Sequence, residues 1–180
     1  MIEELIMYNK YFVTHELYTP YKTSKYPNRK TAILTCMDTR LTELLTASLN
    51  IKNGDAKIIR NAGSVILNDN DTIIRSILIA VLEFDIKDIL VIGHTDCGVS
   101  KISQKNIINK LISRGVSSKD ISEFSKRNKD FVNWFNGFDS EIDEIEKSVM
   151  TLKTHPLIPK DITIKGCLMD TKTGEVSVVI

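Results

Sequence analysis

Residues 88–98 read DILVIGHTDCG, and this stretch decides the fold class. Its first seven residues, Asp88–His94, are nearly all apolar, and a short apolar run of this length is typical of a buried β-strand. Strands without a polar face belong to parallel sheets that are covered by helices on both sides. The run ends in a histidine followed by a polar turn, so this strand would also bring a reactive side chain to one edge of the sheet.

Further strand and helix candidates alternate along the chain on either side of this run. Strands are expected at Thr31–Cys36, Ala56–Asn61, Ile162–Met169 and Val176–Ile180. Helices are expected over residues 2–17 and 42–49, from the N-cap candidates Asp69–Asp71 to Leu82, and over Ser140–Leu152, with several short helices between Val99 and Phe138. Residues 18–29 are polar and contain prolines, which indicates an extended connection.

This alternation predicts an α/β fold in a single domain that spans residues 1–180. Right-handed crossovers between strands would give a mainly parallel central β-sheet flanked by helices. The turn at residues 170–174 predicts a hairpin, and therefore an antiparallel edge strand at the C-terminus. Residues 1–29 would form an N-terminal helical arm and linker, because apolar residues between Ile2 and Val13 lie at helical spacing.

Composition and charge narrow the class of protein further. The chain has 180 residues, 42% apolar and 26% charged, which is the balance of a globular domain with a substantial core. A formal net charge of +1 gives no excess of positive charge of the kind that binds nucleic acid or an acidic membrane surface. The N-terminus is acidic where a signal peptide is basic, and no stretch reaches the roughly 20 apolar residues of a membrane span. We therefore expect a cytoplasmic protein with reduced thiols.

Two of the expected strands end in metal-ligating residues. Cys36 closes the first strand, while His94 closes the third and is followed three residues later by Cys97. Ligands of such sheets bind beyond the carboxyl ends of the strands, so these side chains would meet there if the two strands are neighbours. Two thiolates and an imidazole form a good zinc shell, and three protein ligands leave a fourth position for water, as in catalytic zinc sites.

An acid and a base follow Cys36 in the same strand-end loop. Two thiolates donate more charge to zinc than histidines do, so they would tend to raise the pKa of a bound water, and a nearby group should compensate. Asp38 beside the Arg40 guanidinium would stay ionised and could accept a hydrogen bond from zinc-bound hydroxide. Arg40 would hold Asp38 in place and keep it off the metal.

These motifs together resemble the β-class carbonic anhydrases, especially their small microbial branch. The motifs are CMDTR at residues 36–40, RNAG at residues 60–63 and GHTDCG at residues 93–98, and the resemblance resumes weakly in the closing hairpin at residues 166–174. It implies one zinc per chain on Cys36, His94 and Cys97, with Asp38 and Arg40 as catalytic residues. It also implies reversible hydration of carbon dioxide to bicarbonate and a proton by zinc-bound hydroxide, and a homodimer or higher even oligomer built partly by the N-terminal arm.

The remaining candidates around the site have alternative explanations. The resemblance would place Asn61, Ala62 and Gly63 near the substrate pocket, although a tight loop with Gly63 in a conformation that other residues resist explains them fully. Gly98 fits close packing at the start of a helix, whose dipole would favour the Cys97 thiolate. Asp96 could support the zinc ligands, or it could serve as an N-cap or turn residue.

Several other residues are expected to have structural roles only. Cys167 lies inside a predicted strand without a nearby histidine or cysteine, so we interpret it as core. His15 and His155 are expected to be solvated surface residues rather than metal ligands, with a role as proton shuttle as the alternative for either one. The aromatic residues Phe131, Trp134 and Phe135 would form a core cluster or a dimer contact.

Three rival functions remain open at this point. The same site could hydrolyse a relative of carbon dioxide, such as carbonyl sulfide or carbon disulfide. The chain could instead be a zinc-stabilised binding module without turnover, although such a module has no use for Asp38 and Arg40. Finally, Cys97 could act as a low-pKa nucleophile in thiol chemistry.

Overall fold

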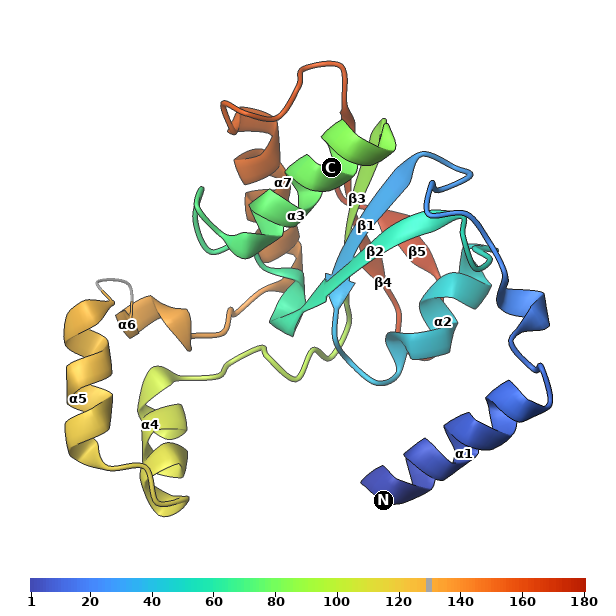
Figure 1. Cartoon of the computed structure of the whole chain (residues 1–180). Helices are drawn as coiled ribbons and strands as arrows, with labels where there is room; N and C mark the ends of the chain where they lie inside the picture. The colour runs from blue at the N-terminus through green and yellow to red at the C-terminus, as the bar shows by residue number, and fades with distance from the viewer. Residues whose placement is uncertain (129–130) are drawn as a thin grey trace.

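The computed structural model describes residues 1–128 and 131–180 of the chain. Its strands are β1 (Thr31–Cys36), β2 (Ala56–Asn61), β3 (Asp88–His94), β4 (Thr163–Met169) and β5 (Val176–Val178). Its α-helices are α1 (Ile2–Thr14), α2 (Leu41–Ser48), α3 (Thr72–Phe84), α4 (Gln104–Ser113), α5 (Ser118–Arg127), α6 (Phe131–Trp134) and α7 (Glu141–Thr154). Two short 3₁₀ turns, η1 (Thr19–Tyr21) and η2 (Ala62–Ser64), complete these elements (Figure 1).

The strands form one twisted sheet in the order β2-β1-β3-β4-β5 within the described residues. β1 pairs with β2 and β3, and β3 pairs with β4, all in parallel, whereas β4 and β5 are antiparallel. The predicted α/β fold with a mainly parallel sheet and an antiparallel C-terminal edge strand is therefore confirmed. β5 ends at Val178 rather than at Ile180, because the N–H groups of Val179 and Ile180 both donate to the carbonyl of Gly166 and break the regular ladder.

A hydrophobic core lies on each face of the sheet. Along β1, Ala32 and Leu34 belong to the core that α3 and α7 cover, while Ile33 between them belongs to the core that α2 covers. This alternation follows from the two-residue period of a strand. Full burial of each large apolar side chain contributes about 1.5–3 kcal/mol, so both faces of the sheet help to hold the strand ends in place.

Side-chain caps fix the ends of the two helices that pack on the first core. The Asp71 carboxylate accepts the N–H of Ile73 at 2.9 Å and starts α3, as its sequence predicts. The Ser140 hydroxyl accepts the N–H of Asp143 at 3.2 Å and starts α7. α3 ends at Phe84, and the residue after it, Asp85, takes the left-handed conformation with φ of 52°.

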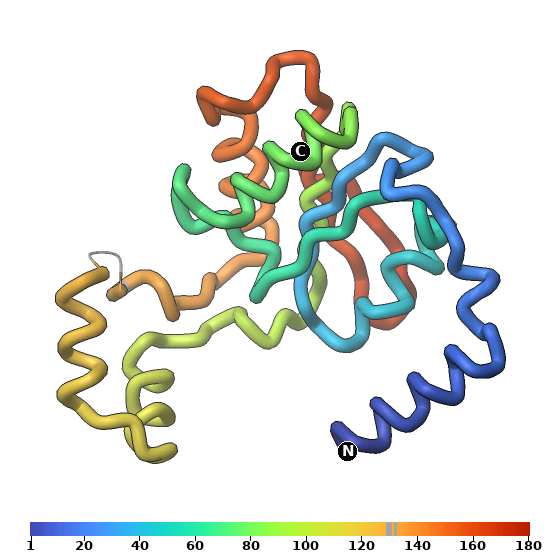
Figure 2. The backbone as a smooth tube through the Cα atoms, in the orientation of Figure 1, coloured from blue at the N-terminus to red at the C-terminus, as the bar shows by residue number. Residues whose placement is uncertain are grey.

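The N-terminal helix α1 extends away from the rest of the chain (Figure 2). It ends at Thr14, three residues earlier than predicted, and Glu16 then turns the chain with a φ of 53°. The connection that follows is not wholly extended, because it contains η1. None of the residues of α1 is buried, and Ile2 and Leu5 are 75% and 69% exposed. Apart from Phe12, which contacts Tyr21, the apolar side of this arm is therefore exposed in the part of the chain that the structure describes.

Helices α4, α5 and α6 form a lobe that stands off from the sheet (Figure 1). An aromatic cluster lies here, with Phe131 buried and in edge contact with Phe124 and Phe135, and with Trp134 half exposed. The expected short helices and aromatic cluster are thus present. No helix of the described ranges is long and apolar enough to cross a membrane.

Two local predictions were wrong. No helix begins at Gly98: the chain makes turns there, and α4 starts only after the Ser103 cap, so no helix dipole acts on Cys97. His155 is buried rather than solvated, because it caps α7 and its ring is hydrogen-bonded on both nitrogens. Its Nε2 lies 3.1 Å from the carbonyl of Asp69, and its Nδ1 accepts the N–H of Leu157 at 3.2 Å.

Candidate metal centre

Two neighbouring parallel strands bring the sulfur and imidazole side chains together. Cys36 is the last residue of β1 and His94 the last residue of β3, so both lie at the carboxyl edge of the sheet. The turn after β3 returns Cys97 to the same point. The Sγ atoms of the two cysteines lie 3.9 Å apart, and the ligand atoms of all three residues lie within 4.8 Å of one another. All three side chains are buried.

The His94 ring is oriented for metal binding. Its Nδ1 lies 3.0 Å from the carbonyl oxygen of Thr95, which can only accept, so Nδ1 carries the proton and Nε2 presents its lone pair. That Nε2 is buried and has no hydrogen-bond partner in the part of the chain that the structure describes. A buried orphan acceptor is costly unless a ligand satisfies it, and a metal ion between Nε2 and the two sulfurs would do so.

The two thiols form a pair of unequal acidity. A hydrogen bond from the Cys97 thiol lowers the pKa of Cys36 to about 4, and donation of that bond raises the pKa of Cys97. The Cys36 sulfur also accepts the N–H of Gly63 at 3.4 Å. The two sulfurs thus share one proton. Because zinc binds the thiolate form of cysteine, a divalent cation would fit at this site.

Gly63 is tied to this site through its backbone. Its φ is 85°, and a Cβ built on it would lie 2.9 Å from Cε1 of Phe138. We expect Gly63→Ala to lower the free energy of unfolding by about 2–4 kcal/mol, from left-handed strain and overpacking combined, and to weaken zinc binding because the N–H shifts away from Cys36. Denaturant unfolding and a zinc titration measure the two effects.

Gly115 offers the matched control for this prediction. It has a φ of 91° but open space around its Cβ position, so Gly115→Ala carries the backbone strain without the clash. It should cost about 1–2 kcal/mol and leave zinc affinity unchanged. Equal zinc affinity in the two variants would show that the backbone of Gly63 does not influence zinc binding.

Asp38 and Arg40 form a two-pronged ion pair beside the trio. The Arg40 Nε and Nη2 donate to the two carboxylate oxygens at 3.0 and 2.9 Å, and the Arg40 backbone N–H donates to Oδ1 at 2.9 Å. These bonds lower the pKa of Asp38 to about 2. The carboxylate Oδ2 lies 3.9 Å from Nε2 of His94, so an ionised acceptor stands next to the ligand cluster.

The pH dependence of this ion pair follows from the lowered pKa. Because the pKa of Asp38 is about 2 in the folded chain and about 3.9 in an unfolded one, the pair stabilises the fold above about pH 4 and loses that contribution as the pH falls through 2. In the metal-free protein we expect the Asp38 carboxyl carbon to show no NMR titration down to about pH 3.5. The substitution Arg40→Gln should raise the titration midpoint of Asp38 toward the ordinary range of a carboxyl group. A midpoint near 3.9 for Asp38 in the unaltered chain would contradict the ion pair with Arg40.

Sequence reasoning missed part of the network around this ion pair. Arg40 also donates to the side chain and the backbone carbonyl of Asp96, and to the hydroxyl of Thr171. Arg60 donates to the carbonyl oxygens of Cys36 and Leu41 at 3.3 and 2.9 Å and so braces the loop that carries Asp38. Arg60 stands in the RNAG motif, which could have indicated a role, but no local signal marks Thr171.

An apolar cavity of about 350 Å³ adjoins the site. Of the predicted pocket residues, Asn61 and Ala62 line it together with Met37 and Val99, which follow the two cysteines closely in sequence. Gly63 and Gly98 are not among its lining residues. The cavity therefore lies beside the ligand cluster and offers mainly apolar walls.

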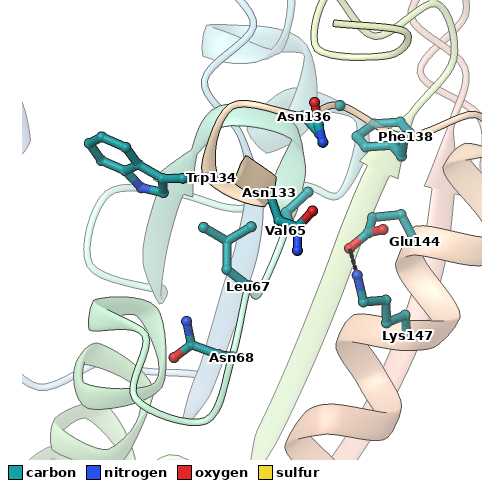
Figure 3. Close-up of a pocket in the computed structure, with 10 residues that line it drawn as sticks. Val65, Leu67, Asn68, Asn133, Trp134, Asn136, Phe138, Glu144 and Lys147 are labelled. Carbon is teal, nitrogen blue, oxygen red and sulfur yellow. Dashed lines mark ion pairs between the residues drawn. The ribbon is translucent and has the colours of Figure 1, made fainter. Parts of the chain in front are cut away.

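A second cavity of about 330 Å³ shares Val65 and Trp134 with the first (Figure 3). Glu144 lines it and lies 3.5 Å from Lys147. Burial raises the pKa of Glu144. No residue of the Cys36, His94 and Cys97 trio lines either cavity, but Met37 and Val99 line the first one, and Val99 packs against the core cluster that contains Cys36 and Cys97.

A sequence profile of a known family covers this whole arrangement. The profile, described as carbonic anhydrase, matches residues 31–176, which include every residue of the ligand cluster and the ion pair. The chain belongs to the β-carbonic anhydrase family. The match begins at the first residue of β1 and reaches the first residue of β5, and the arm α1 lies outside it.

Individual relatives of this β-carbonic anhydrase chain agree with that assignment. It is 41% identical over 180 residues to a Bacillus subtilis protein named "Putative carbonic anhydrase YtiB", covering 100% of this chain and 96% of the relative. It is 34% identical over 159 residues to the carbon disulfide hydrolase of Acidianus sp., covering 81% of this chain and 75% of that protein. Among solved structures, β-carbonic anhydrase isoform I of Trichomonas vaginalis superimposes with a TM-score of 0.88 at 31% identity, covering 100% and 97% of the two chains.

Proposed function

We propose that this protein is a zinc enzyme that catalyses the reversible hydration of carbon dioxide to bicarbonate and a proton. The observation that carries the proposal is the orphaned Nε2 of His94, which faces two thiols and has the ionised Asp38 beside it. A purely structural zinc site is closed by a fourth protein ligand, whereas this cluster offers three ligands and a restrained carboxylate.

Cys36, His94 and Cys97 would hold one zinc ion per chain. When bound, zinc supplies a Lewis acid that acidifies water and so provides a hydroxide nucleophile near neutral pH. The hydrogen bond from Nδ1 of His94 to Thr95 fixes the ring tautomer that such binding requires. The Cys36 thiolate is favoured already by hydrogen bonds from its neighbours.

Asp38 would orient the nucleophile. Its carboxylate is ionised at every physiological pH and can only accept hydrogen bonds, so it can hold the proton of the attacking species and direct the free lone pair toward the substrate. Arg40 holds both carboxylate oxygens and thereby keeps Asp38 from turning to the metal ligands.

Carbon dioxide carries no charge that a protein could bind by ion pairing. The apolar cavity beside Ala62 and Val99 suits such a substrate, since burial of an apolar gas requires only apolar walls. Bicarbonate, being charged, would be held weakly by the same walls and leave readily.

We also infer that the enzyme acts in the cytoplasm, where its thiolate ligands stay reduced, and as a homodimer or higher even oligomer. The exposed apolar residues of α1, among them Ile2 and Leu5, support association of copies through the arm. Light scattering after size exclusion would determine the oligomer, and a monomer would contradict this inference.

The direct test is a stopped-flow assay of carbon dioxide hydration on protein loaded with zinc. We expect turnover well above the buffer rate between about pH 7 and 8.5. Absence of turnover with one zinc per chain would reject the proposed reaction.

Hydrolysis of carbon disulfide is a second candidate, because the Acidianus relative is named for that reaction. Both reactions attack the carbon of a linear triatomic molecule, so the same ligand cluster would serve either one. Direct competition between the two substrates in one assay would separate them: we expect carbon dioxide to be preferred. Protection of Cys97 from alkylation by bound zinc would at the same time exclude free thiol chemistry.

A further inference from the structure

Asp96 accepts hydrogen bonds along the edge of the Arg40 guanidinium that adjoins the edge held by Asp38. The Arg40 Nη2 donates to the backbone carbonyl of Asp96 at 2.7 Å, and Nη1 donates to its carboxylate at 2.9 Å. With the two bonds from Arg40 to the Asp38 carboxylate, the planar guanidinium is held by acceptors along two adjacent edges. Arg40 is therefore a bridge between the loop after β1 and the loop after β3.

The backbone conformation of Asp96 makes this double contact available. Its φ of 55° is left-handed, a conformation that costs most L-residues free energy but that aspartate and asparagine tolerate better than others. The residue stands between two expected metal ligands, His94 and Cys97, and strained backbone at such a position needs support from its surroundings.

Thr171 ties a third loop to the same guanidinium. Its hydroxyl accepts from Nη1 of Arg40 at 3.4 Å, and it lies 3.2 Å from the hydroxyl of Thr95. The backbone N–H of Thr171 donates to that same Thr95 hydroxyl at 3.1 Å. The turn of the C-terminal hairpin is thus joined to the loop that carries Asp96.

The exposure of these groups argues against a role in stability. The Asp96 side chain is 88% exposed and that of Arg40 is 39% exposed, and ion pairs so open to solvent contribute little to folding. The Asp38 side chain, by contrast, is only 15% exposed. The exposed Asp96 can instead hold the orientation of the Arg40 guanidinium, and that guanidinium in turn restrains the more enclosed Asp38.

We propose that Asp96, supported by Thr171, is a positioning residue that fixes Arg40 and through it the orientation of Asp38. This inference rests on the proposed carbon dioxide hydration for its kinetic consequence, but the fixing of Arg40 itself does not depend on that reaction.

The test compares Asp96→Asn with a matched control. Asparagine keeps the shape and tolerates the left-handed backbone, so the change removes charge with little added strain. Asp85→Asn is the control, since Asp85 also has a left-handed backbone with φ of 52° and pairs with Lys30, at the opposite edge of the sheet. We expect Asp96→Asn to lower kcat/KM about 3- to 10-fold with one zinc per chain retained, and Asp85→Asn to leave it unchanged.

An NMR readout tests the restraint without any turnover. The Nε–H of Arg40, assigned by its loss in Arg40→Lys, should exchange slowly with water in the unaltered zinc-loaded chain. Asp96→Asn should accelerate that exchange and Thr171→Val should do so to a smaller extent, while Asp85→Asn should not. Exchange in Asp96→Asn as slow as in the control would overturn the proposal.

A double-mutant cycle then asks whether Asp96 acts through Asp38. In an Asp38→Ala background, Asp96→Asn should cause no further loss of activity, because the carboxylate it positions is gone. A further loss of equal size would overturn the proposal. If the unaltered zinc-loaded chain has no turnover, the proposed function fails, and the exchange of the Arg40 Nε–H still decides the positioning role.

Discussion

Cys36→Ser should release the metal and abolish activity. A serine hydroxyl does not ionise near neutral pH, so the variant offers a neutral oxygen where the parent offers a thiolate whose pKa is lowered to about 4. Loss of a direct ligand should weaken zinc binding by more than about 100-fold, the upper range seen when only a supporting residue is lost. Metal analysis by native mass spectrometry, which also reports subunit number, and a competitive zinc titration are the measurements.

Cys167→Ser provides the matched control for this substitution. Cys167 is equally buried but lies in β4 outside the ligand cluster, so the same chemical change there tests the general cost of placing a hydroxyl in the core. It should lower stability by about 1–3 kcal/mol and retain one zinc per chain. Full zinc occupancy in Cys36→Ser would contradict the assigned ligand set, and loss of zinc in Cys167→Ser would point to a general collapse of the fold.

Asp38→Ala should retain the metal and lose most of the activity. The carboxylate is not one of the three expected ligands, so zinc content should stay at one per chain. Without the acceptor, the nucleophile is no longer oriented, and removal of a single preorganised hydrogen-bonding group in other active sites costs about 100- to 1000-fold in kcat. Stopped-flow kcat and kcat/KM, measured on protein of verified zinc content, give the result.

Asp55→Ala is the control for this second prediction. Asp55 also pairs with an arginine, Arg29, at 3.3 Å, but it precedes β2 at the opposite edge of the sheet. Its loss should affect stability alone and leave the activity per folded molecule unchanged. Full activity in Asp38→Ala would remove Asp38 and Arg40 from the mechanism, and loss of zinc in that variant would make Asp38 part of the metal site.

Ligands of parallel sheets bind beyond the carboxyl ends of the strands, and this explains why the ligand cluster could be anticipated from the sequence. Once Thr31–Cys36 and Asp88–His94 are parallel neighbours, their last residues must lie at the same edge of the sheet, and the structure shows that pairing. The segments themselves are marked by local apolar runs, so little beyond strand adjacency had to be assumed. The proximity of Cys36 and His94 follows from these two facts, and the turn after β3 adds Cys97, so that the ligand atoms lie within 4.8 Å of one another.

Where sequence reasoning failed, the deciding contacts are distant in the chain. His155 was expected to be a solvated surface residue, yet it is buried, and its Nε2 lies within hydrogen-bond distance of the carbonyl of Asp69, 86 positions away. Gly98 was expected to begin a helix, but the chain continues in turns as far as the Ser103 cap of α4.

The sequence by itself determined the fold class and the three candidate metal ligands, because periodicity and strand polarity are local properties that short segments carry alone. Only the tertiary structure decided how the site is held. The hydrogen bonds from Arg40 to Asp96 and Thr171 depend on where side chains meet after folding. Hydrogen bonds between groups 56 and 131 positions apart leave no pattern in the local sequence, since only the packed sheet brings their loops together.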